Sequence, residues 1–193
     1  MAIEYQLHAA TPAAWLEAVM ADFDTFLLDH AANERKASAM AMSMVAHYPD
    51  RTQMVEKLIE LAIEELNHYK QVVKLVFGRG LELGADIKDP YVNQLRHHVR
   101  RPSEAFLLDR LLLGSIIEAR GAERFALVAE TVEEKGLSNF YRSLASSEER
   151  HHLLFIQLAE LYFPPGEIRL RLTEWLEIEA QVMSRLPITA RLH

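Results

Sequence analysis

The stretch Glu65-Leu66-Asn67-His68 decides the fold that we expect for this chain. Glu and His three residues apart on a helix point from the same face, so both side chains can reach one metal ion. The same spacing returns at Glu148-Glu149-Arg150-His151. One such pair is a weak indication, because Glu-rich helices contain it by chance. Two copies in two apolar segments indicate a metal site.

A single Glu precedes each pair at nearly the same distance. Glu34 lies 31 residues before Glu65, and Glu118 lies 30 residues before Glu148. Two Glu-x-x-His motifs plus one Glu from each of two further helices are the ligand set of ferritin-like di-metal bundles. The matching offsets therefore predict a duplicated helix pair that supplies six ligands: Glu34, Glu65, His68, Glu118, Glu148 and His151.

The single Glu of the second pair has a competitor. Glu123 lies in the same apolar segment, but only 25 residues before Glu148, which breaks the repeat. We therefore prefer Glu118. A carboxylate among core positions is costly to bury alone, and metal ligation would remove that cost.

The register of the second motif also has an alternative. Glu149 and His152 form an overlapping Glu-x-x-His, and spacing alone does not exclude it. We prefer Glu148 and His151 because a Leu-Ala pair precedes Glu148 by four residues, as another precedes Glu65.

The composition is typical of one all-α domain over residues 1–193. Half of the residues are hydrophobic, Gly and Pro number only seven each, and strand-like alternation is missing. The absence of Cys excludes disulfides and thiolate metal sites. We find no signal peptide and no apolar run long enough for a membrane span, so we expect a soluble cytoplasmic protein. The net charge of −7 argues mildly against a nucleic acid partner, although a local basic patch can override it.

Apolar residues recur at steps of three and four along most of the chain. They predict helices over residues 12–20, 22–46, 51–77, 91–99, 104–130, 138–163 and 167–186. Residues 79–102 are richer in Gly and Pro and form the long crossover between two helix pairs. The expected fold is therefore an all-α, ferritin-like four-helix bundle with a long crossover and an additional C-terminal helix. Four residues mark the core face of that last helix: Trp175, Ile178, Val182 and Leu186.

The ligand set predicts the chemistry. Four carboxylates and two imidazoles suit iron or manganese, and they neutralise two divalent ions. Open positions on such a pair would accept dioxygen. Two ferrous ions supply two electrons, and a hydroxylation cycle needs two more. The chain has no flavin or nicotinamide fingerprint, so we expect an external electron donor, a reductase or ferredoxin.

Four stretches of the chain resemble a known family: DHAANERKA (29–37), EELNHYKQV (64–72), LLDRLLLGSIIEARGAERFALVA (107–129) and SSEERHH (146–152). They are similar to the tRNA-(2-methylthio-N6-isopentenyl-adenosine) hydroxylases, and SIIEARGAERF is the most specific part. The resemblance implies a ferritin-like di-iron monooxygenase that hydroxylates the isopentenyl group of the modified adenosine next to the anticodon. It also implies two non-haem iron ions as cofactor, held by the six ligands named above. The tandem His151-His152 departs from the family pattern.

A tRNA substrate requires cations that bind phosphate. The most basic stretch lies in the crossover, where Arg96, Arg100 and Arg101 are the candidates. A solvated, charge-balancing surface is the competing interpretation. Arg120 and Arg124 could pair with carboxylates rather than with RNA.

Two other functions fit part of the pattern. An iron-handling ferritin-like protein, a ferroxidase or a storage subunit, would use the same ligands, but only the ligand set supports it. A helical bundle without metal would keep its stability when a ligand such as Glu65 or His151 is removed.

Overall fold

The computed structural model describes residues 3–101 and 103–193, and every regular element within these ranges is a helix. The helices are α1 (Ala13–Ala21), α2 (Phe23–His47), α3 (Thr52–Gly78), α4 (Pro90–Arg96), α5 (Ser103–Thr131), α6 (Lys135–Glu160) and α7 (Pro165–Arg185). The chain divides into two compact units. One unit holds the described residues up to Leu16, Lys88–Ile188 and His193, and the other holds Glu17–Ile87 and Thr189–Leu192.

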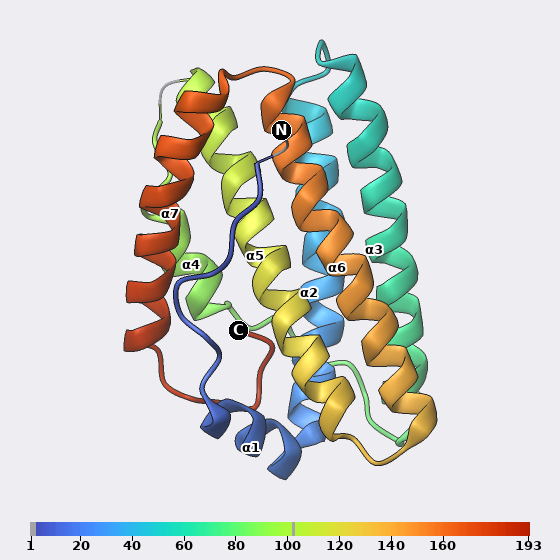
Figure 1. Cartoon of the computed structure of the whole chain (residues 1–193). Coiled ribbons are helices and arrows are strands. Elements are labelled where there is room, and N and C mark those ends of the chain that lie inside the picture. Colours follow the sequence, from blue (N-terminus) through green and yellow to red (C-terminus); the bar gives the residue numbers. More distant parts are fainter. Residues whose placement is uncertain (1–2, 102) are drawn as a thin grey trace. The chain divides into compact units, whose positions relative to one another are not determined.

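The α2–α3 unit is a pair of long helices that lie side by side (Figure 1). Asp22 caps α2, because its carboxylate accepts a hydrogen bond from the backbone N–H of Thr25 at 3.1 Å. The hydroxyl of Ser38 donates to the carbonyl of Ala62 at 2.8 Å and ties the two helices together. Gly80 follows the end of α3 with a φ of 74°, a conformation that favours glycine.

The larger unit is built on a second long pair, α5 and α6, with α4 and α7 packed against α5 (Figure 1). Gly114 lets α5 approach α6 closely, because a Cβ at this position would lie 3.0 Å from the ring of Phe155. The chain before α1 also packs on this unit: the hydroxyl of Tyr5 lies 2.8 Å from that of Ser115. The pair is thus covered by segments from both ends of the sequence.

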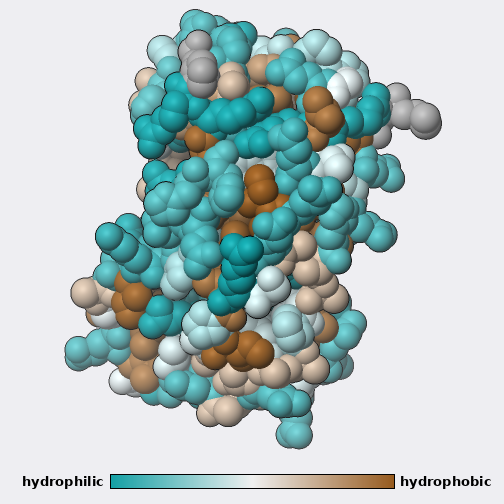
Figure 2. Space-filling model, turned by 90° about the vertical axis from the view of Figure 1, so that its left-hand side faces the viewer, coloured by the Kyte–Doolittle hydropathy of each residue, from teal (hydrophilic) through white to brown (hydrophobic). Residues whose placement is uncertain are grey.

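The last helix, α7, buries charged groups as well as apolar ones. Trp175 and Val182 lie in the core as expected, whereas Ile178 and Leu186 are only half-buried. Arg171 and Glu179, two residues that the apolar pattern did not indicate, are buried instead. Polar side chains cover most of the outer surface on this side, with hydrophobic ones in small separate groups (Figure 2).

The predicted helices are confirmed. Every helix end lies within three residues of its expected position, with the largest differences at α4 and α6. Within the described residues, no helix has the length and hydropathy that crossing a membrane requires. The expected single domain over residues 1–193 stays a prediction.

Candidate metal centre

Three of the predicted ligands converge inside the α2–α3 unit. Glu34 comes from α2, and Glu65 and His68 come from α3. The ligand atoms of the three residues all lie within 4.8 Å of one another. His68 Nδ1 lies 3.5 Å from Glu34 Oε2 and 3.6 Å from Glu65 Oε2. Each of the three residues is at most 6% exposed, so the cluster is buried.

The pKa shifts in this cluster favour the charged forms of its side chains, a carboxylate at Glu34 and an imidazolium at His68. Burial alone would raise the pKa of Glu34, but hydrogen bonds from His30 and His68 hold it well below its usual value. Burial alone would lower the pKa of His68, but Glu34 and Glu65 raise it to about 9. In the metal-free protein His68 is therefore protonated at neutral pH. A metal ion would have to displace that proton, because only a neutral imidazole coordinates.

His30 is a further member that the spacing did not single out. Its side chain is fully buried, and its Nε2 lies 2.7 Å from Glu34 Oε1. His30 stands one helical turn before Glu34, so the two residues lie on the same face of α2, and this spacing could have indicated His30. A hydrogen bond of this kind orients a ligand carboxylate and tunes its basicity.

The other three predicted ligands converge inside the larger unit. Glu118 lies on α5, and Glu148 and His151 lie on α6. Their ligand atoms all lie within 4.8 Å of one another, and His151 Nδ1 is 3.3 Å from Glu148 Oε2. None of the three is more than 6% exposed. Gly121 of α5 lies next to Glu148, since a Cβ there would be 3.7 Å from Glu148 Cγ.

The overlapping pair Glu149 and His152 faces another direction. Glu149 is exposed and His152 is half-buried. Both line a cavity of about 690 Å³ between α5, α6 and the segment Tyr5–Ala10. The ring of His152 meets that of Tyr5 edge-on, with 5.5 Å between their centroids.

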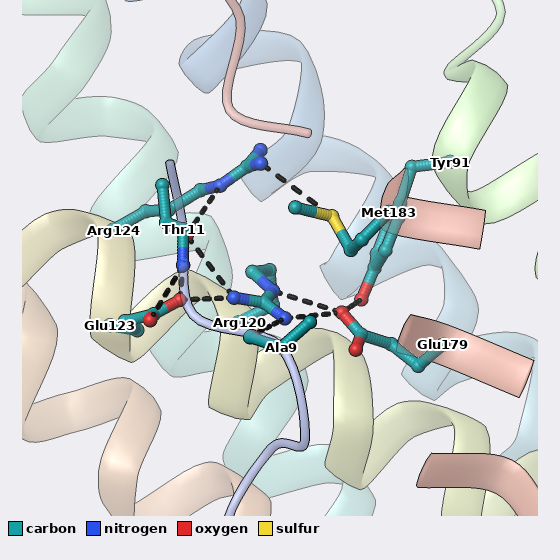
Figure 3. Close-up of polar contacts among 8 residues, drawn as sticks. All are labelled: Ala9, Thr11, Tyr91, Arg120, Glu123, Arg124, Glu179 and Met183. Carbon is teal, nitrogen blue, oxygen red and sulfur yellow. Dashed lines mark hydrogen bonds and ion pairs between the residues drawn. The ribbon is translucent and has the colours of Figure 1, made fainter. Parts of the chain in front are cut away.

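Glu123, the competitor of Glu118, takes part in a different cluster, drawn in Figure 3. Its carboxylate accepts hydrogen bonds from the backbone N–H and the hydroxyl of Thr11 at 3.0 and 2.6 Å, and it pairs with Arg120. Arg120 also binds Glu179 of α7 and the carbonyl of Ala9. The prediction that Arg120 pairs with carboxylates is thereby confirmed.

Arg124 is held differently from Arg120. Its guanidinium lies 4.7 Å from the centroid of the Trp15 ring. It also donates to the sulfur of Met183 (Figure 3). Burial and the nearby charge of Arg120 lower the pKa of Arg124 to about 10. Arg124 is 3% exposed, so RNA could not reach it.

The three candidate RNA contacts differ in what surrounds them. Arg96 and Arg101 are exposed. The guanidinium of Arg100 binds the buried carboxylate of Asp109, with 2.8 Å between Nη2 and Oδ1. Asp109 also binds Arg171. Arg100 thus has a structural partner that the sequence pattern did not reveal.

The residues present fit a pair of hard or borderline metal ions. Each unit supplies two carboxylates and one imidazole, all buried, which is the donor chemistry that iron and manganese prefer. Two carboxylates per ion balance a divalent charge, so the set is suited to a buried site.

Comparisons with known proteins show what the chain is similar to. A family model described as tRNA-(MS[2]IO[6]A)-hydroxylase (MiaE) matches residues 1–193. The tRNA 2-(methylsulfanyl)-N(6)-isopentenyladenosine(37) hydroxylase of Pseudomonas putida is 38% identical over 166 residues, which are 86% of this chain and 80% of the relative. The protein of the same name from Salmonella typhimurium is 31% identical over 155 residues, which are 80% of this chain and 56% of that relative.

A solved structure shares the fold. It is described as protein 43 with aldehyde deformylating oxygenase activity from Synechococcus, and it is 33% identical. The match covers 98% of this chain and 96% of the other, with a TM-score of 0.93. The prediction of an all-α, ferritin-like fold is confirmed.

Proposed function

The chain belongs to the tRNA-(MS[2]IO[6]A)-hydroxylase (MiaE) family, and we propose that it hydroxylates the isopentenyl group of 2-methylthio-N6-isopentenyl-adenosine in tRNA. The observation that supports this most directly is the pair of buried clusters, each with two carboxylates and one imidazole, in a chain of this family. Membership of the family indicates the substrate. The clusters contain the carboxylates and imidazoles that would bind the metal ions of the reaction.

The two clusters together would hold the metal. Glu34, Glu65 and His68 would provide half of the donors of a di-iron centre, and the other half would come from these residues: Glu118, Glu148 and His151. In this arrangement residues 1–193 act as one domain. When bound, the two iron ions would supply the redox chemistry that activates dioxygen for insertion into a C–H bond.

The protein's own groups prepare that chemistry. Glu34 and Glu65 hold an extra proton on His68 until metal displaces it, because they raise its pKa to about 9. His30 fixes the carboxylate of Glu34. In the other helix pair, Gly121 packs beside the side chain of Glu148. These contacts would set the ligand positions before metal enters.

The cycle needs two partners besides tRNA. Dioxygen provides the oxygen atom, and one atom enters the product while the other leaves as water. That balance takes two electrons and two protons from outside the substrate, so a reductase or ferredoxin would serve as donor. A tRNA substrate places the reaction in the cytoplasm. Arg96 and Arg101 would contact the RNA phosphates, and Arg100 would contribute only in part because it binds Asp109.

A single assay tests the proposal. The protein is loaded with ferrous iron and supplied with dioxygen, a chemical reductant and tRNA that carries the isopentenyl nucleoside. Digestion and mass spectrometry should find a nucleoside heavier by one oxygen atom. Full iron loading without that product would contradict the proposed substrate.

A matched pair of variants tests the ligands. Glu148→Ala should lose iron and hydroxylation together, whereas Glu149→Ala should keep both, because Glu149 is exposed beside the cavity. The reverse result would move the site to the overlapping Glu149 and His152 register.

A further inference from the structure

Helix α3 carries a second apolar face, separate from the one that it buries. Ile63, Leu66 and Phe77 are 58%, 53% and 58% exposed, and Ile59 is 38% exposed. With Lys70 and Val73 they form a stripe at alternating steps of four and three: Ile59, Ile63, Leu66, Lys70, Val73 and Phe77. At 3.6 residues per turn, the stripe lies roughly 130° around the helix from the buried face.

This stripe is longer than chance exposure explains. Single exposed apolar residues are ordinary, but four exposed apolar residues in one row, with the half-buried Val73 between Lys70 and Phe77, mark a surface for a partner. Its 4-3 spacing is that of the inner positions of a helix that packs against another helix. Met42 of the neighbouring α2, itself 46% exposed, adds to the apolar surface of this unit.

The charges beside the stripe indicate which helix would fit. Glu60, Asn67 and Lys74 are seven residues apart and run along one flank, and all three are exposed. The amino-terminal half of the flank is thus acidic and the carboxyl-terminal half basic. Lys57 lies 2.8 Å from Glu60, but this exposed pair is worth little and can be exchanged.

We propose that a second copy of this chain docks on this face, with the two α3 helices antiparallel. In an antiparallel pair, equivalent flanks of the two helices meet. Glu60 of one copy would then face Lys74 of the other, and the contact would occur twice by symmetry. A parallel pair would instead place this flank against the opposite flank of the partner helix, so Glu60 and Lys74 would not meet.

The apolar layers fit the same register. Ile59 of one copy would meet Phe77 of the other, and Ile63 would meet Val73. Leu66 would lie against the aliphatic stem of Lys70, whose amine can reach water. The two-fold axis would pass beside Asn67, so the two Asn67 side chains would face each other. The interface is self-complementary, as a two-fold dimer requires.

Sedimentation of the purified full-length chain over about two decades of concentration tests whether the dimer forms. We expect dimers that dissociate on dilution. The double variant Ile63→Glu/Phe77→Glu should remain monomeric, with the helical circular dichroism of the parent. Leu170→Glu is the matched control, because Leu170 is an exposed apolar residue of α7, 67% exposed, and should leave the dimer intact. A parent chain that is monomeric throughout, or that pairs only with a different protein, would overturn the proposal.

A charge exchange tests the orientation. Glu60→Lys alone and Lys74→Glu alone should each weaken the dimer, and the double variant should recover it, because the opposite charges again face each other. If the double variant loses as much dimer affinity as the two single variants lose together, the antiparallel arrangement is wrong.

Single cysteines provide an independent test, since the chain contains no Cys of its own. Asn67→Cys lies beside the proposed axis and should form a disulfide-linked dimer on oxidation. Glu56→Cys would lie about 34 Å from its copy in the antiparallel pair and should not. Cross-linking through Glu56→Cys but not Asn67→Cys would contradict the antiparallel dimer.

Discussion

Arg120 of α5 and Glu179 of α7 form an ion pair from which water is excluded, with 2.6 Å between Arg120 Nη2 and Glu179 Oε1. Both side chains are fully buried. The hydroxyl of Tyr91 donates to the same carboxylate oxygen at 3.1 Å. Because Arg120 also binds the carbonyl of Ala9, this pair joins α4, α5, α7 and the amino-terminal segment (Figure 3).

Removing one partner of this pair should lower the free energy of unfolding. Glu179→Ala leaves the charge of Arg120 buried without its main counter-ion, so we expect a loss of about 3–5 kcal/mol in the free energy of unfolding. Urea unfolding monitored by circular dichroism measures it. Glu177→Ala, at an exposed position of the same helix, should change stability by less than about 0.5 kcal/mol. The apolar double variant Arg120→Met/Glu179→Leu should recover most of the loss, and equal losses in all three variants would disprove this account.

The stability of the α5–α7 contact should depend on pH through Asp109. Burial alone would raise the pKa of Asp109, but Arg171 and Arg100 lower it below the ordinary value of 3.8. The stabilisation is therefore fully present above that value and is lost as pH falls through the folded-state pKa. Asp109→Asn should be less stable than the parent at pH 7, and the difference should shrink as the solution is acidified. A constant difference from neutral to acid pH would show that the charge of Asp109 does not contribute.

The contact between Gly114 and Phe155 should leave no room for an added methyl group. Gly114→Ala improves helix propensity by about 1 kcal/mol, but its Cβ would lie 3.0 Å from a fully buried ring. We expect overpacking to prevail and to lower the free energy of unfolding by about 1–3 kcal/mol. Gly78→Ala, where no atom lies within 4 Å of the added Cβ, is the control. A stabilised Gly114→Ala protein would mean that the ring moves aside easily.

His30 should matter for metal affinity more than for folding. His30→Ala removes the hydrogen bond to Glu34, and losses of such supporting contacts typically weaken metal binding about 10–100-fold. Titration with ferrous iron under anaerobic conditions measures the affinity. His47→Ala, at an exposed position at the end of the same helix, should bind iron like the parent. Unchanged iron affinity in His30→Ala would remove His30 from the site.

The exposed crossover cation Arg101 should contribute to RNA affinity. Arg101→Glu should weaken tRNA binding, and the slope of log K against log salt should fall by about one unit for each lost phosphate contact. Arg185→Glu, at an exposed position at the end of α7, is the charge-matched control. If both variants lose affinity equally, the effect is one of net charge and not of a local surface.

The sequence by itself determined the helices and which carboxylates and imidazoles share a helix face. The three- and four-residue steps that predict a helix also place Glu65 with His68, and Glu148 with His151, on one face. Helical geometry is local, so spacing was sufficient. The same steps place Glu34 and Glu118 at inner positions of their own helices, and both are buried.

Only the tertiary structure decided which polar side chains became partners across helices. Glu123 and Glu118 look alike in the sequence, but Glu123 binds Arg120 and Thr11. Arg100 looks like a free cation, but it binds Asp109. Such pairs join residues as far apart as Thr11 and Glu123, and no periodicity within one helix encodes them. Their geometry depends on how neighbouring helices pack, because a buried charge is stable only where another segment supplies its counter-ion.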